Sequence, residues 1–484
     1  MEKRNQSDTL AVSFIWRFLE LAGSQGVNFV ISIILARLLM PADYGRVATI
    51  SVFISIIDVF ITKGFGTALI QKKDADPIDF STVFYFNIFF TAVLYIFIFV
   101  SAPAAAYFYK DKEMCALIRV LGIRVPLSGI NSVQQAFLSK RMDFRKFFFA
   151  TLCGTLLSAL TGIAMAYQGY GVWAIVFQYL VNAFADTWML WVLSGWRPGL
   201  AFSFERLKIL FDYGWKLLCS GLLGSIYNNI QAIIIGKKYT SADLAFYNKG
   251  KQLPQTIISG ISTAIEGVMF PAMANNQDTD DKVKSIARKS IAFSSYIMFP
   301  ILMGIFAVGD SLIILLFTEK WEPCIWVLRL ACIIYFFWPL ETVHLQVVKA
   351  LGRSDIFLKL EMIKKFLGIA GLITGIRWGV RGILIGEAVC SVLSVISDSI
   401  PSVWLISYSL KEQMHDIFQP LVLSVLMCIC VLLSGYMLHL SVPLQLFIQT
   451  GIGFIVYGSA SIVLQNPCYK YLMTLIKTYL SRGA

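Results

Sequence analysis

Residues 10–45 read LAVSFIWRFLELAGSQGVNFVISIILARLLMPADYG, a long apolar run that ends in a charged turn containing a proline. The apolar part, residues 10–36, is long enough to cross a lipid bilayer as a helix. It follows the polar stretch MEKRNQSD and is longer than the apolar core of a signal peptide. No small-residue cleavage pattern follows it, so we expect a first membrane helix that is retained.

The rest of the chain repeats this alternation of apolar runs and charged turns. Of its 484 residues, 57% are hydrophobic and 14% are charged, whereas soluble proteins carry about 25% charged residues. This composition excludes a soluble protein. We predict about fourteen membrane spans. They lie near residues 10–36, 46–70, 81–108, 115–138, 147–167, 171–194, 209–235, 244–274, 286–317, 323–349, 356–376, 379–408, 417–439 and 443–464.

The net charge of +12 is explained by membrane topology. If both termini are cytoplasmic, the cytoplasmic segments hold about 24 lysines and arginines, among them Lys364, and the outer loops about 11, among them Lys251, as the positive-inside rule requires. We therefore expect cytoplasmic termini and no nucleic-acid partner. The last segment, NPCYKYLMTLIKTYLSRGA, predicts a short amphipathic helix on the inner membrane surface.

An internal repeat appears when the sequence is shifted by 200 residues. ARLLMPADYG, which starts at Ala36, then falls on GKKYTSADLA, which starts at Gly236, and Asp43 falls on Asp243. Each repeat contains six predicted spans, and an even number makes the two repeats parallel in the membrane.

The predicted fold is therefore an all-α integral membrane protein with two parallel six-helix bundles that form a V-shaped central cavity. A further pair of helices follows the repeat. The predicted domains are an N-terminal lobe (1–200), a C-terminal lobe (201–410), the additional helix pair (411–466) and the cytoplasmic amphipathic tail (467–484).

Ionisable residues inside the predicted spans indicate function, because each costs about 2.5 to 3.5 kcal/mol at the centre of a membrane helix. Polar residues of the first span, from Arg17 to Asn28, recur at intervals of three and four and share one helical face. The seventh span carries a similar face, which starts at Lys216. The two faces predict a water-filled cavity.

The predicted cavity contains three groups of residues. The candidate binding cations for an anionic substrate are Arg17, Lys63, Lys216, Arg119, Arg124 and Arg329. The candidate polar lining residues are Ser24, Asn28, Asn228 and Gln231. The candidates for binding a coupling ion are Asp58, Glu266, Glu341 and Glu387.

Two alternatives to a cavity remain open at this point. Each of these charges could form an ion pair or hydrogen bond that only joins neighbouring helices. The side chains of Arg119, Arg124 and Arg329 could also extend from a span end to the membrane interface.

No motif of a catalytic or cofactor-binding site is present. The nine cysteines and three histidines lack metal-ligand spacing, and phosphate-binding loops, serine-hydrolase elbows and zinc-protease motifs do not occur. No loop exceeds about 20 residues, whereas catalytic domains need at least about 50. We expect a transporter that uses no metal or cofactor and is not an enzyme.

Four segments resemble the polysaccharide flippases, the Wzx-like branch of the multidrug/oligosaccharidyl-lipid/polysaccharide exporter superfamily, near the colanic acid and teichuronic acid exporters. The segments are IILARLLMPADYGRVA (33–48), SKRMDFRKF (139–147), GWRPGLAFSF (195–204) and LAFYNKGKQLPQTIISGISTAIEGVMFPAMA (244–274). The resemblance implies a bacterial inner-membrane protein that moves an undecaprenyl-pyrophosphate-linked oligosaccharide to the outer leaflet by alternating access. It further implies that a cationic cavity holds the pyrophosphate, for which Arg17, Lys63 and Lys216 are the positions that could match.

Two other functions are weighed against this one. A cation-coupled multidrug exporter of the same architecture would favour acids and aromatic residues in the cavity, and the basic residues argue against it. A membrane-embedded glycan polymerase or acyltransferase would need a large outer loop or a catalytic histidine or arginine cluster on a loop. The expected partners are the lipid-linked oligosaccharide, membrane lipids, a coupling proton or sodium ion and a polysaccharide polymerase.

Overall fold

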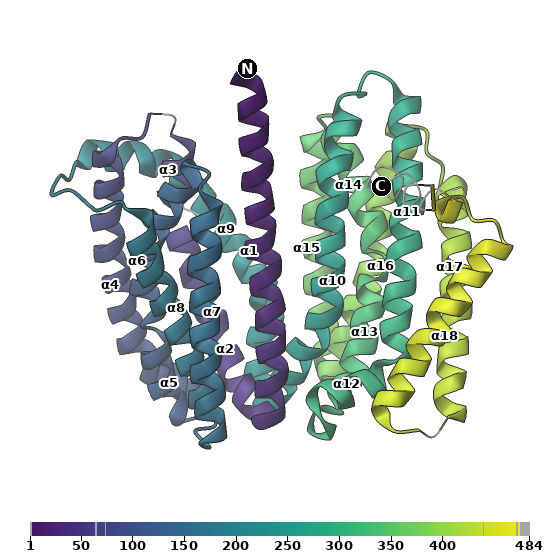
Figure 1. Ribbon diagram of the computed structural model, residues 1–484, viewed down its shortest axis with the longest axis horizontal. Coiled ribbons are helices and arrows are strands. Elements are labelled where there is room, and N and C mark those ends of the chain that lie inside the picture. The colour runs from purple at the N-terminus through teal and green to yellow at the C-terminus, as the bar shows by residue number, and fades with distance from the viewer. Residues whose placement is uncertain (1, 63–64, 73, 439, 471–472, 475–484) are drawn as a thin grey trace. The chain divides into compact units, whose positions relative to one another are not determined.

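The computed structural model describes the backbone of residues 2–62, 65–72, 74–438, 440–470 and 473–474. These residues form α-helices and two short 3-10 helices, and no strand occurs among them (Figure 1). The helices are α1 (Glu2–Leu38), α2 (Pro41–Thr62), α3 (Phe65–Gln71), α4 (Pro77–Tyr109), α5 (Glu113–Leu121), α6 (Arg124–Lys140), α7 (Phe144–Tyr167), α8 (Val172–Ser194), α9 (Phe204–Lys238), α10 (Ser241–Ala274), α11 (Asp280–Ala307), α12 (Gly309–Phe317), η1 (Glu319–Trp321), α13 (Cys324–Phe336), α14 (Trp338–Ala350), α15 (Ser354–Gly375), η2 (Ile376–Trp378), α16 (Gly379–Leu405), α17 (Leu410–Met437) and α18 (Val442–Val463).

The helices pack into two compact units, Met1–Ala245 and Phe246–Ala484. The boundary lies five residues into α10, so α9 packs with the first unit, where it contacts α2, α3 and α4. The sequence repeat divides the chain near residue 200 instead, before α9. The four domains drawn from the repeat therefore stay a prediction about sequence organisation.

The order of helices repeats with the register that the sequence predicts. Helix α1 ends at Leu38 and α2 begins at Pro41, and 200 residues later α9 ends at Lys238 and α10 begins at Ser241. In the first unit α8 packs against α6 and α7, and in the second unit α16 packs likewise against α14 and α15. The two halves thus use the same local helix pairing.

The two aspartates that the repeat aligns lie in the first turns of corresponding helices, α2 and α10. Asp43 accepts a hydrogen bond from the backbone N–H of Met40 (3.3 Å), and Asp243 accepts one from the backbone N–H of Thr240 (3.0 Å). A carboxylate in the first turn satisfies a backbone donor that the helix leaves unpaired and lies favourably at the positive end of the helix dipole. The sequence match at these positions therefore has a local structural cause.

Several predicted spans consist of two consecutive helices. The span predicted at 115–138 comprises α5 and α6, the span at 286–317 comprises α11 and α12, and the span at 323–349 comprises α13 and α14. Pro339 lies in the first turn of α14, where proline is tolerated because the backbone N–H there has no helical partner.

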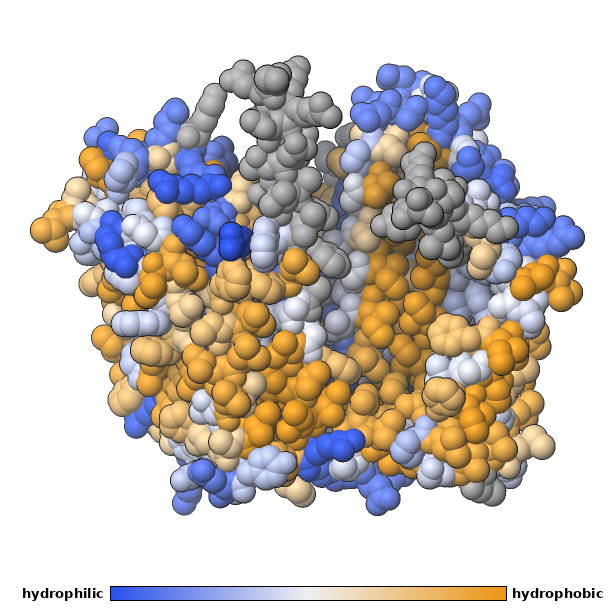
Figure 2. All heavy atoms as spheres, in the orientation of Figure 1, coloured by the Kyte–Doolittle hydropathy of each residue, from blue (hydrophilic) through white to orange (hydrophobic). Residues whose placement is uncertain are grey.

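Ten segments of the described chain are long and apolar enough to cross a membrane, which makes this a multi-pass membrane protein. This number is lower than the predicted fourteen, partly because Ser354–Leu405 counts once although it contains both α15 and α16. On the face shown in Figure 2, apolar residues dominate the middle of each unit and hydrophilic residues gather at its two ends.

The additional helix pair, α17 and α18, is an integral part of the second unit. Helix α17 packs along α11, where the Arg288 guanidinium donates two hydrogen bonds to Asp416 (2.8 and 2.7 Å). The Tyr457 hydroxyl of α18 donates to the Tyr296 carbonyl of α11 (2.7 Å). Most of the predicted amphipathic tail, residues 467–484, lies outside the described residues.

Candidate functional site

The side chains of three of the predicted cavity cations are not among the described parts of the structure. The backbone of Arg17 belongs to α1 and that of Lys216 to α9, but their side chains are not described. Lys63 falls in the undescribed pair of residues between α2 and α3. A binding role for these three residues stays a prediction from the sequence.

The other three cations contact groups within their own unit. The Arg119 side chain lies over the Phe99 ring (4.1 Å) and donates a hydrogen bond to the Phe99 carbonyl (3.2 Å). The Arg124 guanidinium lies 5.5 Å from the Tyr179 ring centre. In the second unit, Arg329 pairs with Asp310 (2.8 Å), which lies in the first turn of α12.

The predicted polar residues differ in exposure. Asn28 and Asn228 are exposed, whereas Ser24 and Gln231 are half-buried. The Thr62 hydroxyl donates to the Asp58 carbonyl of its own helix (2.9 Å). A hydroxyl that bonds to the preceding helical turn needs no water in the membrane, so Thr62 of α2 does not itself require a cavity.

A lysine accompanies Glu387, one of the predicted coupling-ion residues. The Lys251 ammonium of α10 donates to Glu387 Oε1 of α16 (2.6 Å) and to the Tyr247 hydroxyl (3.0 Å). The two side chains are 12% and 21% exposed. Because the pair joins two helices of the second unit, it has the form of the helix-to-helix alternative that the sequence leaves open.

A second lysine accompanies Glu341. The Lys364 ammonium of α15 lies 2.8 Å from Glu341 Oε1 of α14 and 2.8 Å from Glu361 Oε1 of its own helix. It also lies 3.4 Å from Oδ2 of Asp398, which belongs to α16 and is fully buried. One cation thus faces three carboxylates at the junction of three helices, α14, α15 and α16.

The remaining two coupling-ion candidates have different surroundings. Asp58 of α2 is half-buried and interacts electrostatically with Arg124. In the second unit, Glu266 of α10 is half-buried and forms no ion pair with the described residues of the chain.

Sequence reasoning missed both lysines because it assigned them to loops. Lys251 was expected in an outer loop and Lys364 in a cytoplasmic segment, although the predicted spans 244–274 and 356–376 include them. The structure corrects this, since both lie well inside helices, α10 and α15. Their position within predicted spans was the signal that could have identified them.

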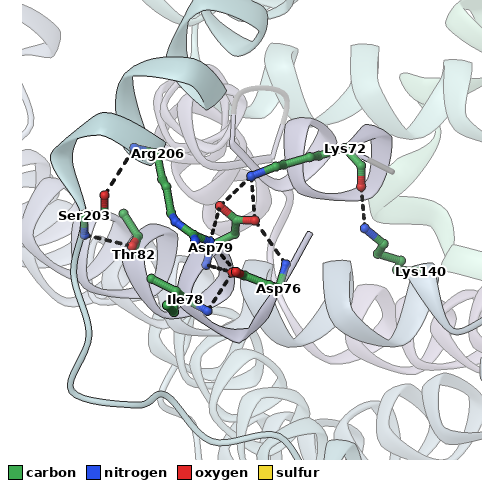
Figure 3. A network of polar contacts seen from close by, with 8 residues as sticks. All are labelled: Lys72, Asp76, Ile78, Asp79, Thr82, Lys140, Ser203 and Arg206. Atoms are coloured by element: carbon green, nitrogen blue, oxygen red, sulfur yellow. Dashed lines mark hydrogen bonds and ion pairs between the residues drawn. The ribbon is translucent and has the colours of Figure 1, made fainter. Parts of the chain in front are cut away.

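A charged network holds the start of α9 against the start of α4 (Figure 3). Asp79 is fully buried, and each of its two carboxyl oxygens accepts a hydrogen bond from the Lys72 ammonium at 2.7 Å. Its Oδ2 atom also accepts one from the backbone N–H of Asp76 (3.1 Å). The Arg206 guanidinium reaches Asp76 (2.5 Å) and Asp79 (3.5 Å). The first helix of the second repeat is thereby joined to the first unit.

Asp76 and Arg206 stabilise each other's charged forms. The hydrogen bond from Arg206 holds the pKa of Asp76 below its usual range, and backbone N–H groups at the start of α4 act in the same direction. Asp76 in turn raises the pKa of Arg206. Both groups therefore stay ionised at neutral pH. The Asp76 side chain also caps α4 by accepting from the backbone N–H groups of Ile78 and Asp79.

A family model described as "Polysaccharide biosynthesis protein" matches residues 34–326, more than half of the chain. The chain belongs to this polysaccharide biosynthesis family. The match begins near the end of α1 and continues to the start of α13. It covers both segments that the repeat aligns, residues 36–45 and 236–245. It agrees with the family resemblance described in the sequence analysis.

Curated relatives of this polysaccharide biosynthesis protein extend over most of its length. The teichuronic acid biosynthesis protein TuaB of Bacillus subtilis is 25% identical over 75% of this chain and 74% of its own. The succinoglycan biosynthesis transport protein ExoT of Rhizobium meliloti is 21% identical over 97% of this chain and 96% of its own length. The lipopolysaccharide biosynthesis protein WzxC of Escherichia coli is 22% identical over 77% of this chain and 76% of its own length.

Solved structures show which fold this family member adopts. The lipid II flippase MurJ in an inward closed conformation superposes with a TM-score of 0.76 at 12% identity, over 95% of this chain and all of MurJ. An inward-facing multidrug resistance transporter of the MOP superfamily gives a TM-score of 0.60 at 17% identity, over 80% and 96%. The chain thus has the fold of the MOP superfamily.

Proposed function

We propose that this protein flips an undecaprenyl-pyrophosphate-linked oligosaccharide, a repeat unit of a lipopolysaccharide, capsule or exopolysaccharide, across the bacterial inner membrane. The observation that carries the proposal is the family match together with full-length similarity to a succinoglycan transport protein. The fold shared with a lipid II flippase is compatible with it. A transporter of this kind performs no covalent chemistry.

The chemistry of the substrate explains why the membrane helices contain charges. A sugar chain needs a polar path, and a diphosphate needs cations that lie within the hydrocarbon region. We propose that Arg17, Lys63 and Lys216 bind the diphosphate. Arg119 and Arg329 already contact Phe99 and Asp310, so they are weaker candidates for this role.

The remaining features of the proposal are the membrane topology, the coupling ion and the partner enzyme. We propose cytoplasmic termini, because the cytoplasmic loops would then carry the larger share of lysine and arginine. A proton or sodium ion supplies the driving force by binding to acids inside the helices, and a polysaccharide polymerase uses the exported repeat unit. The number of fourteen spans and the V-shaped cavity belong to this proposal.

Deletion of the gene, followed by mass spectrometry of lipid-linked glycans, tests the function. The expected result is accumulation of an undecaprenyl-diphosphate-linked oligosaccharide that cannot be reached from the outer side of the inner membrane. Complementation with the full chain should restore the surface polysaccharide. If no glycan accumulates and drug sensitivity changes instead, the protein is a multidrug exporter of the same fold.

A further inference from the structure

Asp398 is an acid that lies inside the second unit without hydrogen-bond donors. Its side chain is fully buried in α16, and neither carboxyl oxygen accepts a hydrogen bond from the described residues. Its nearest cation is the Lys364 ammonium, 3.4 Å from Oδ2. Asp79 is equally buried, but it receives two hydrogen bonds from Lys72 and one from the backbone. An ionised carboxylate in the position of Asp398 would be poorly solvated.

The neighbouring acids compete with Asp398 for the same lysine. Lys364 lies 2.8 Å from both Glu341 and Glu361, closer than it lies to Asp398. If all three carboxyl groups were ionised, the four side chains would carry a net charge of −2 at membrane depth. One bound proton reduces this charge to −1, and the fully buried carboxyl gains most from being neutral.

Groups on the other helices that surround α16 do not supply a second cation for Asp398. On α14, His344 is fully buried and forms a hydrogen bond to Ser402 (2.8 Å) through its Nδ1 atom. On α13, Tyr335 lies near Lys251, which pairs with Glu387. Glu387 is eleven residues from Asp398 on α16, or about 16 Å along the helix.

The groups on α17 are also engaged elsewhere. Asp416 is held by two hydrogen bonds from Arg288 and by one from the Tyr408 hydroxyl (2.8 Å). Lys364 is therefore the only cation that the described contacts place beside Asp398.

We propose that Asp398 is a proton-binding site, occupied when Lys364 pairs with Glu341 and Glu361 as it does in this structure. The site lies seven residues before the end of α16, about 10 Å along the helix. The ligand is a proton and not a metal ion, because the lysine ammonium already occupies the place beside the carboxylates where a cation would bind.

Release of the proton requires an exchange of partners. The O–H bond of the Asp398 carboxyl breaks and a new O–H bond forms on the Glu341 carboxylate, while the Lys364 ammonium moves towards Asp398. The net charge of the cluster is unchanged in this step. Glu341 is 28% exposed and passes the proton to water. A role in driving transport rests on the proposed flippase function, whereas proton binding by itself does not.

Infrared spectroscopy of the purified full-length protein in lipid bilayers, titrated with pH, tests the site. The wild-type protein should show the carbonyl band of a protonated carboxylic acid at neutral pH. Asp398→Asn should remove this band. Asp355→Asn is the control: it removes an acid of the same helix, α15, that is 53% exposed and pairs with Arg353 outside the cluster, and it should leave the band in place.

A second variant keeps the test decisive if Asp398→Asn does not fold. Lys364→Gln removes the neighbouring cation, so the band should persist to a pH about one unit higher, which corresponds to tenfold tighter proton binding. Lys364→Arg should behave as the wild type. Equal bands in the wild type and Asp398→Asn, or an unchanged titration in Lys364→Gln, would overturn the proposal. A wild-type protein that shows the band but exports no glycan would instead refute the flippase function alone.

Discussion

The Lys251 ammonium lies 2.6 Å from Glu387 Oε1, although the two residues are 136 positions apart in the sequence. The contact joins α10 to α16, and both side chains are largely buried. An isolated charge in this position would be costly in the membrane. The pair therefore neutralises two charges that neither helix could accommodate alone.

We expect Lys251→Met to destabilise the second unit by about 3 kcal/mol or more, because it leaves the Glu387 carboxylate buried without its cation. Lys251→Met combined with Glu387→Gln should recover much of the loss. Thermal unfolding of the purified variants in detergent measures both effects. Arg353→Ala, which breaks the exposed pair with Asp355 (47% and 53% exposed), serves as the control and should barely move the midpoint. A double variant as unstable as the single one would show that the pairing contributes nothing.

Gly45→Val should prevent stable folding of the first unit. A Cβ atom on Gly45 would lie 1.6 Å from the Ser241 carbonyl oxygen, which belongs to the backbone and cannot rotate away. We expect a loss of about 3 kcal/mol or more, at the upper end of overpacking effects. Expression level and thermal midpoint report it.

Gly224→Ala is the matched control for Gly45→Val, since no atom lies within 4 Å of a Cβ placed on Gly224 in α9. Alanine there should be tolerated or should stabilise the helix by about 0.5 to 1 kcal/mol. Equal tolerance of both substitutions would contradict the close approach of α2 to the junction between α9 and α10.

The contribution of the charged network at the start of α4 should depend on pH. Because Arg206 lowers the pKa of Asp76 in the folded protein, the unfolded state takes up a proton first as the pH falls. The stabilisation is therefore complete above the ordinary aspartate pKa of about 4 and is lost as the pH falls through the lower folded-state value.

Asp76→Asn isolates this charge, because asparagine also caps helices well. At pH 7 the variant should unfold at a lower temperature than the wild type, and the difference should shrink as the solution is acidified. Asp74→Asn, in the same loop and exposed, is the control and should have little effect at either pH. A difference that stays constant on acidification would exclude the charge effect.

Arg17→Ala and Lys216→Ala should abolish glycan export while the protein remains inserted in the membrane. The charge-conserving variants Arg17→Lys and Lys216→Arg should retain part of the activity, because a diphosphate needs cations more than a particular geometry. Lys411→Ala, an exposed residue of α17, provides the control. Surface polysaccharide and membrane-bound protein are measured on the same cells. Normal export by both alanine variants would refute a diphosphate site at these positions.

Local properties of the sequence determined much of the fold. Hydrophobic runs long enough to cross a bilayer predict membrane helices, because the bilayer requires every backbone group to be paired within a segment. Asp43 and Asp243, which the repeat aligns, lie in the first turns of α2 and α10, just before the predicted spans 46–70 and 244–274 begin, and each accepts a hydrogen bond from a backbone N–H close by in the sequence. The aligned ends of α1 and α9 follow from the same repeat.

Only the tertiary structure decided which charges meet. The sequence assigned Lys251 and Lys364 to loops, yet they are the partners of Glu387 and of Glu341. Ion pairing across helices depends on which faces pack together, and residues far apart in the chain carry no local signal of their contact. Asp398 lies within the predicted span 379–408, but its lack of hydrogen-bond donors among the described residues arises only from the packing of α14, α15 and α16.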